Sequence, residues 1–195
     1  IRHFFVSTDS GADKMKEKGQ PKESIIRSSF PINSKFIKSF DSFRIEREKL
    51  GLKNKFTILF TFGAEGVGRT EIIEELAKHK VDVQIVAICG RSYETKEKVE
   101  EIKRRYPDAD INVLGFVTNI EDYLYTCDIS AGKSGMNATF ESIYMQKPFL
   151  VTAAMPNEKD TARRIYLQAL RNFWETYYRL RLLTLYDFER GEPIG

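Results

Sequence analysis

Apolar runs and amphipathic segments alternate along the middle of the chain. Five continuous apolar runs have the length of buried β-strands; they cover residues 56–62, 81–89, 111–117, 128–131 and 149–154. The segments between them, such as residues 70–80, place apolar side chains three and four positions apart, which predicts helices with one inward face. Parallel strands that alternate with helices need crossover connections. The pattern therefore predicts an α/β fold with a doubly wound, Rossmann-like parallel sheet.

The same pattern divides the chain into three parts. Residues 1–50 contain a strand, a capped helix and a stretch broken by turn residues, so we expect the end of a preceding domain and a linker. Residues 51–160 carry the regular alternation and should form one ligand-binding domain. Residues 161–195 are expected to hold a long C-terminal helix, rich in aromatic and arginine side chains. Because the sequence starts inside a strand and without Met, we expect that a segment upstream is missing.

Residues 128–148 join the fourth strand to a helix through a turn of small residues. The sequence is DISAGKSGMNATFESIYMQKP, and its proline ends the helix. The first N–H groups of a helix lie at the positive end of its dipole, where they suit an anion. One turn into the helix, Glu141 supplies a carboxylate that could hold a sugar hydroxyl. The stretch is therefore typical of a nucleotide site.

Two better-known phosphate-binding motifs do not fit the chain. GKS at 132–134 ends like a P-loop, but Cys127 stands at the required earlier glycine, and the motif follows the fourth strand instead of the first. GAEGVG at 63–68 lacks the G-x-G-x-x-G spacing of a dinucleotide site, and no acidic residue ends the second strand. An ordinary turn stays an alternative for this loop. For Phe116, the alternative is an ordinary position in the hydrophobic core. For Glu141, it is a solvated position on the helix surface.

Composition adds a few exclusions. The net charge of +3 is small and its lysines and glutamates are interspersed, so nucleic acid is not an expected partner. Cys89 and Cys127 end apolar runs, which is typical of buried thiols in a reducing cytoplasm. The two histidines share no metal-like spacing with them, and we expect no metal or other cofactor. No apolar run reaches the length of a membrane-spanning helix.

The order of four motifs resembles a known family. EGVG, QIVAICGRS, VLGFVTNIEDYL and CDISAGKSGMNATFESIYMQKPFL follow one another as in the donor-binding C-terminal domain of GT-B glycosyltransferases. More specifically, the chain is similar to the monogalactosyldiacylglycerol synthase and processive diacylglycerol glucosyltransferase group over roughly residues 3–162. The resemblance implies a UDP-sugar donor and inverting, metal-independent transfer of a hexose to a lipid such as diacylglycerol. The general base and the lipid site would lie in the missing acceptor domain, so the chain alone should be inactive.

The resemblance also implies roles for individual residues. Phe116 and Ile120 would flank the uracil, Glu141 would bind the ribose hydroxyls, and residues 134–138 would bind the diphosphate. The full expected substrate-binding set is Gly63, Ala64, Glu65, Gly66, Arg91, Phe116, Ile120, Ser134, Gly135, Met136, Asn137, Ala138, Glu141, Asn157 and Glu158, with Asp160 near the sugar.

Departures from the family pattern keep alternatives open. The linker arginine of the family is replaced by Asn33, and Met136 makes the helix start bulkier. A non-catalytic nucleotide-binding or scaffold module, and a UDP-sugar epimerase, therefore remain alternative functions. The basic and aromatic C-terminal segment permits either peripheral membrane contact or ordinary packing with solvated arginines. We accordingly expect a cytoplasmic location, with a peripheral site on the inner face of the membrane as the second possibility.

Overall fold

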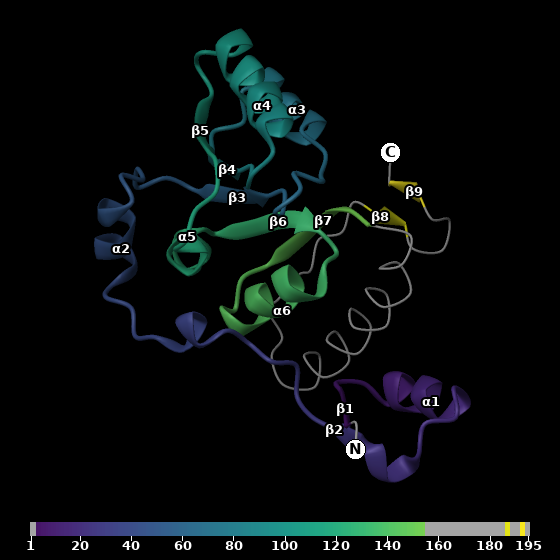
Figure 1. The fold of residues 1–195 in the computed structure, drawn as a ribbon. Coiled ribbons are helices and arrows are strands. Elements are labelled where there is room, and N and C mark those ends of the chain that lie inside the picture. Colours follow the sequence, from purple (N-terminus) through teal and green to yellow (C-terminus); the bar gives the residue numbers. More distant parts are fainter. Residues whose placement is uncertain (1–2, 155–185, 188–191, 194–195) are drawn as a thin grey trace. The chain divides into compact units, whose positions relative to one another are not determined.

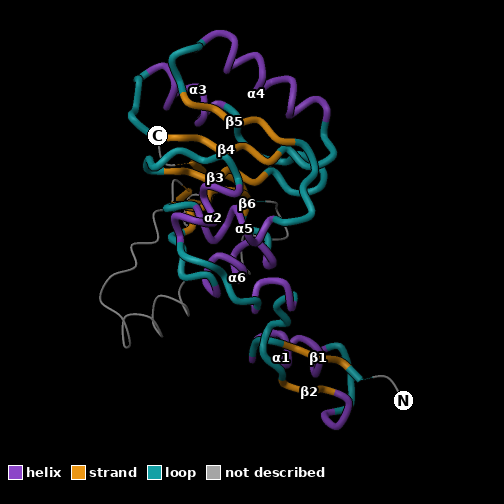
Figure 2. The backbone as a smooth tube through the Cα atoms, turned by 90° about the vertical axis from the view of Figure 1, so that its left-hand side faces the viewer, coloured by secondary structure: helices purple, strands orange, loops and turns teal. Residues whose placement is uncertain are grey.

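A computed structural model describes residues 3–154, 186–187 and 192–193 (Figure 1). The chain forms two compact units, Ile1–Ser34 and Lys35–Gly195. In the first unit, β1 (Phe4–Val6) pairs in parallel with β2 (Ile25–Arg27), and the short 3-10 helix η1 (Lys22–Ser24) precedes β2. Between them α1 (Asp9–Glu17) packs against the strands (Figure 2). The strand β2 lies within the stretch interpreted as linker, because three residues are too few to show a strand period.

The second unit is built on a five-stranded parallel sheet with the order β5-β4-β3-β6-β7. Its strands are β3 (Thr57–Thr61), β4 (Gln84–Ile88), β5 (Asp110–Leu114), β6 (Ile129–Lys133) and β7 (Phe149–Ala153). Helices α3 (Glu71–Lys78) and α4 (Tyr93–Arg105) cover one face, and α5 (Ile120–Thr126) and α6 (Met136–Tyr144) cover the other (Figures 1 and 2). The predicted α/β doubly wound sheet is confirmed.

The core explains why the strands read as continuous apolar runs. All five residues of β4 and the first four of β3 are buried, because both faces of the sheet are covered. From α3 and α4, Ile73 and Val99 are fully buried against them. Both helices were predicted to turn these faces inward.

One buried arginine holds the amino-terminal edge of the sheet. The 3-10 helix η2 (Ser34–Ile37) and α2 (Phe43–Lys49) precede β3, and Arg47 of α2 is 3% exposed. Its guanidinium lies 3.5 Å from the Asp128 carboxylate. It donates hydrogen bonds to the carbonyl oxygens of Lys53, Lys55 and Thr126 and to the hydroxyl of Thr57. Arg47 therefore ties α2 to segments on either side of β3.

Past β7 the structure describes two short strands, β8 (Tyr186–Asp187) and β9 (Glu192–Pro193), which pair antiparallel. The rest of the predicted C-terminal helix lies outside the described residues, as do Asn157, Glu158 and Asp160. Among the helices that are described, none is long and apolar enough to cross a membrane.

Candidate functional site

A cavity of about 970 Å³ lies at the carboxyl ends of β3, β4 and β6, together with the start of α6. The strand order places β3 beside both β4 and β6, so the crossovers leave the sheet in opposite directions at this point. Ligands of doubly wound sheets bind beyond the carboxyl ends of the strands at such a switch point. The volume also lies in the range of small-molecule sites. The cavity is therefore the candidate binding site.

Most of the predicted site residues line this cavity. They are Gly63, Ala64, Phe116, Ile120, Ser134, Gly135, Met136, Asn137, Ala138 and Glu141. Three predicted residues, Glu65, Gly66 and Arg91, are outside its lining. Gly66 has φ +70°, and a Cβ there would lie 2.2 Å from the Ser92 side chain. Glycine is therefore required at this position by packing against Ser92.

The loops after β3 and β4 are joined through their backbones. Gly90 has φ +62°, and a Cβ there would lie 2.2 Å from the Gly63 carbonyl oxygen. The Arg91 N–H donates to the Ala64 carbonyl at 3.2 Å. Because Gly63 and Ala64 line the cavity, the turn after β4 fixes one of its walls.

The start of α6 forms a second wall. β6 continues through Lys133, so the predicted Gly/Ser turn is reduced to Ser134 and Gly135. Gly135 is the N-cap and has no side chain to accept from the first N–H groups of the helix. Ser134 is 3% exposed, and its hydroxyl has no hydrogen-bond partner among the residues that the structure describes. A buried hydroxyl on a cavity wall is suited to a ligand oxygen.

Glu141 of α6 brings a carboxylate into the same cavity. Burial raises the pKa of the Glu141 carboxyl, the positive charge of Lys35 lowers it, and the negative charge of Glu121 raises it again; the net shift is upward. Glu141 is half-buried on the cavity wall, so it is not a fully solvated helix position. Its environment suits a carboxylate that accepts hydrogen bonds from ligand hydroxyls.

Phe116 lies at the mouth of the cavity with 57% of its surface exposed, so the core alternative is wrong. The Arg91 guanidinium carbon lies 4.9 Å from the centre of the ring. Arg91 thus lies beside the site through Phe116, although it does not line the cavity. An exposed aromatic ring can stack on a planar base.

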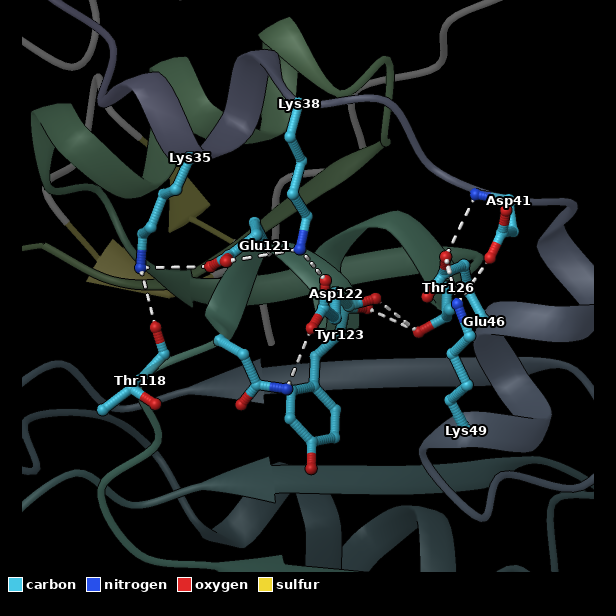
Figure 3. Close-up of polar contacts among 11 residues, drawn as sticks. Lys35, Lys38, Asp41, Glu46, Lys49, Thr118, Glu121, Asp122, Tyr123 and Thr126 are labelled. Atoms are coloured by element: carbon cyan, nitrogen blue, oxygen red, sulfur yellow. Dashed lines mark hydrogen bonds and ion pairs between the residues drawn. The ribbon is translucent and has the colours of Figure 1, made fainter.

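Several lining residues were missed by sequence reasoning. They include Lys35, Thr61, Thr118, Ser130, Lys133 and Ser142. Lys35 precedes every strand of the five-stranded sheet in sequence, yet its ammonium group lies 3.3 Å from the Thr118 carbonyl (Figure 3). The local signal is the apolar pair Phe36 and Ile37 between Lys35 and Lys38, of which Phe36 is 1% exposed and anchors this segment.

Comparison with known proteins adds a family. The glycosyltransferase family 28 C-terminal domain matches residues 68–170. Processive diacylglycerol beta-glucosyltransferases of Bacillus cereus and Bacillus thuringiensis are each 27% identical over 161 residues, which is 82% of this chain and 41% of theirs. The chain thus spans about two fifths of the length of these relatives.

Solved structures share the fold at low identity. The glycosyltransferase WaaG, involved in lipopolysaccharide biosynthesis, has a TM-score of 0.55 at 15% identity over 89% of this chain and 58% of its own. Anabaena HepE in complex with UDP-glucose has a TM-score of 0.53 at 14% identity, covering 90% and 56%. Neisseria meningitidis UDP-GlcNAc 2-epimerase bound to UDP-GlcNAc has a TM-score of 0.50 at 14% identity, covering 90% and 54%. Transferases and an epimerase thus share this fold, which alone does not choose between them.

Proposed function

Because the chain belongs to the glycosyltransferase family 28 C-terminal domain family, we propose that its cavity binds the UDP part of a UDP-sugar donor. The chain is the C-terminal domain of a GT-B glycosyltransferase related to the diacylglycerol glucosyltransferases. One observation carries the proposal: an exposed ring, an unpartnered buried hydroxyl and a carboxylate meet in one cavity, at Phe116, Ser134 and Glu141.

Each part of UDP has a suitable partner there. The uracil stacks on Phe116 beside Ile120, and the ribose hydroxyls donate to the Glu141 carboxylate. The diphosphate lies at the start of α6, where the backbone N–H groups of residues 136–138 and the Ser134 hydroxyl donate to its oxygens. The same donors stabilise the charge that develops on the leaving UDP in an inverting transfer, without a required metal or cofactor.

The complete protein, we propose, transfers a hexose from a UDP-sugar to a lipid acceptor such as diacylglycerol. The support is the diacylglycerol glucosyltransferase activity of the relatives that are 27% identical. The general base and the acceptor site would belong to a further domain, so the 195-residue chain should bind nucleotide without catalysing transfer. We propose a cytoplasmic location, with a peripheral position on the inner face of the membrane as the second possibility.

Isothermal titration of UDP into the 195-residue chain tests the nucleotide site. Glu141→Ala should weaken UDP binding about 10-fold to 100-fold, the effect of losing hydrogen bonds to a charged acceptor. Glu97→Ala is the matched control, because Glu97 is an exposed α4 residue away from the cavity. Absence of binding at millimolar UDP, or equal binding by the Glu141 variant, would contradict the proposal.

The activity of the complete protein separates the remaining functions. Incubation with UDP-glucose or UDP-galactose and diacylglycerol should give a glycolipid and free UDP. A soluble epimer of the sugar nucleotide would show an epimerase instead. Nucleotide binding without any product would show a non-catalytic module.

A further inference from the structure

Lys35 reaches the cavity from outside the sheet. It lies in η2, next to the fully buried Phe36, and its side chain is 33% exposed. Its ammonium group lies 3.1 Å from the Glu121 carboxylate and 3.3 Å from the Thr118 carbonyl oxygen (Figure 3). Two contacts from the α5 region and one buried neighbour therefore hold this cation at the cavity wall.

Glu121 is a buried carboxylate that forms ion pairs with two lysines. The residue is 6% exposed, and Lys38 lies 3.6 Å from its second oxygen (Figure 3). Lys38 also pairs with Asp122, and it does not line the cavity. The two lysines thus make similar ion pairs to Glu121, but Lys35 alone of the two faces the candidate site.

We propose that Lys35 is a positioning residue for the nucleotide, holding the Glu141 carboxylate ready to accept hydrogen bonds from vicinal ligand hydroxyls. The proposal rests on the proposed function, in which those hydroxyls belong to a ribose. Lys35 contributes through charge, from a different element of the fold, and does not itself transfer a proton or a group.

The charges around Glu141 support this role. Burial and the negative charge of Glu121, from α5, raise the pKa of the Glu141 carboxyl, while the positive charge of Lys35, from η2, lowers it. Lys35 of η2, Lys133 of β6 and Glu141 of α6 line the same cavity. Loss of Lys35 would remove one of these positive charges while the negative charge of Glu121 still acts on Glu141, which favours the protonated form of Glu141. A protonated Glu141 loses acceptor capacity, so UDP affinity should fall as pH falls through its pKa.

Two variants distinguish this role from ordinary packing. Lys35→Met and Lys38→Met each remove one cation from Glu121 and keep an aliphatic stem. UDP is titrated into the 195-residue chain between about pH 5 and 8. The UDP affinity of Lys35→Met should be about fivefold lower than that of the unmodified chain at the acid end and should recover toward pH 8. Lys38→Met should show the same pH profile of UDP binding as the unmodified chain. In a Glu141→Gln background, Lys35→Met should add no pH dependence.

A measurement without nucleotide keeps the two proposals apart. NMR titration of the Glu141 side-chain carboxyl carbon should show a higher midpoint in Lys35→Met than in Lys38→Met. Equal midpoints, or equal pH profiles of UDP binding in the two variants, would overturn the role of Lys35. If no variant binds UDP, nucleotide binding itself is refuted, and the carboxyl titration still decides whether Lys35 controls Glu141.

Discussion

Replacing Gly90 by alanine should damage both stability and ligand binding. Gly90 follows β4 with φ +62°, and an added Cβ would lie 2.2 Å from the Gly63 carbonyl oxygen and 3.2 Å from that of Ala64. Both contacted residues line the cavity. The methyl group would therefore push against the backbone of a cavity wall, which cannot rotate away as a flexible side chain can.

The cost has two parts. The left-handed backbone conformation costs alanine about 1 kcal/mol more than glycine. To reach an ordinary carbon–oxygen contact, the loop must also move by about 1 Å, and overpacking of this kind costs about 1–3 kcal/mol. The total of about 2–4 kcal/mol is a large share of the about 5–15 kcal/mol that stabilises a typical domain.

Gly51→Ala is the matched control. Gly51 has φ +65°, nearly the conformation of Gly90, but a Cβ there meets no atom within 4 Å. Urea unfolding should therefore give a loss of about 1 kcal/mol for Gly51→Ala and about 2–4 kcal/mol for Gly90→Ala. UDP titration should show weaker binding only for Gly90→Ala. Equal losses of stability, or unchanged UDP affinity in the Gly90 variant, would refute the reasoning.

Three further predictions concern buried groups. At pH values above about 5, Glu141→Gln should raise Tm, because folding raises the pKa of the Glu141 carboxyl and its ionised form therefore lowers stability. The gain should vanish near pH 4, where the carboxyl is protonated in both states. An unchanged Tm at pH 8 would contradict this prediction. Arg47→Met should cost about 3–5 kcal/mol in urea unfolding by orphaning buried carbonyls; a loss under 1 kcal/mol would contradict it. Burial raises the pKa of Cys89 to about 11 and of Cys127 to about 12, so iodoacetamide at pH 7.5 should modify neither thiol unless urea is added.

The sheet could be predicted because the hydrophobic pattern that specifies its strands and helices lies within short stretches of sequence. β3 and β4 are buried on both faces, so each appears in the sequence as a continuous apolar run. The inward positions of α4, Val99 and Ile102, recur at helical spacing. The carboxyl ends of β3 and β5 then bring Gly63 and Phe116 to one cavity, and α6, which follows β6, adds Glu141.

The rest depends on contacts that no local pattern records. The partners of Arg47 come from separate segments, so no pattern near Arg47 in the sequence indicates that its side chain is buried. The strand β6 extends past its predicted end because Gly132, which lacks a Cβ, can pair closely with Thr61 of β3. A Cβ at this position would lie 2.8 Å from the Thr61 carbonyl oxygen. Lys35 meets Glu121 across 86 residues of sequence, and only the folded chain brings them together.

The strand order also determines when the cavity can form. β3, β4 and β5 pair in sequence order through single crossovers, whereas β6 pairs with β3 across about 70 residues. Closing the longer loop costs more chain entropy, so we expect the half-sheet β3-β4-β5 to assemble first and β6 with α6 to dock on its edge later. Ser134 and Glu141 arrive only with that second half. The ability to hold a ligand would then be acquired at the end of folding, and a bound nucleotide would act chiefly against unfolding of the β6-α6-β7 half.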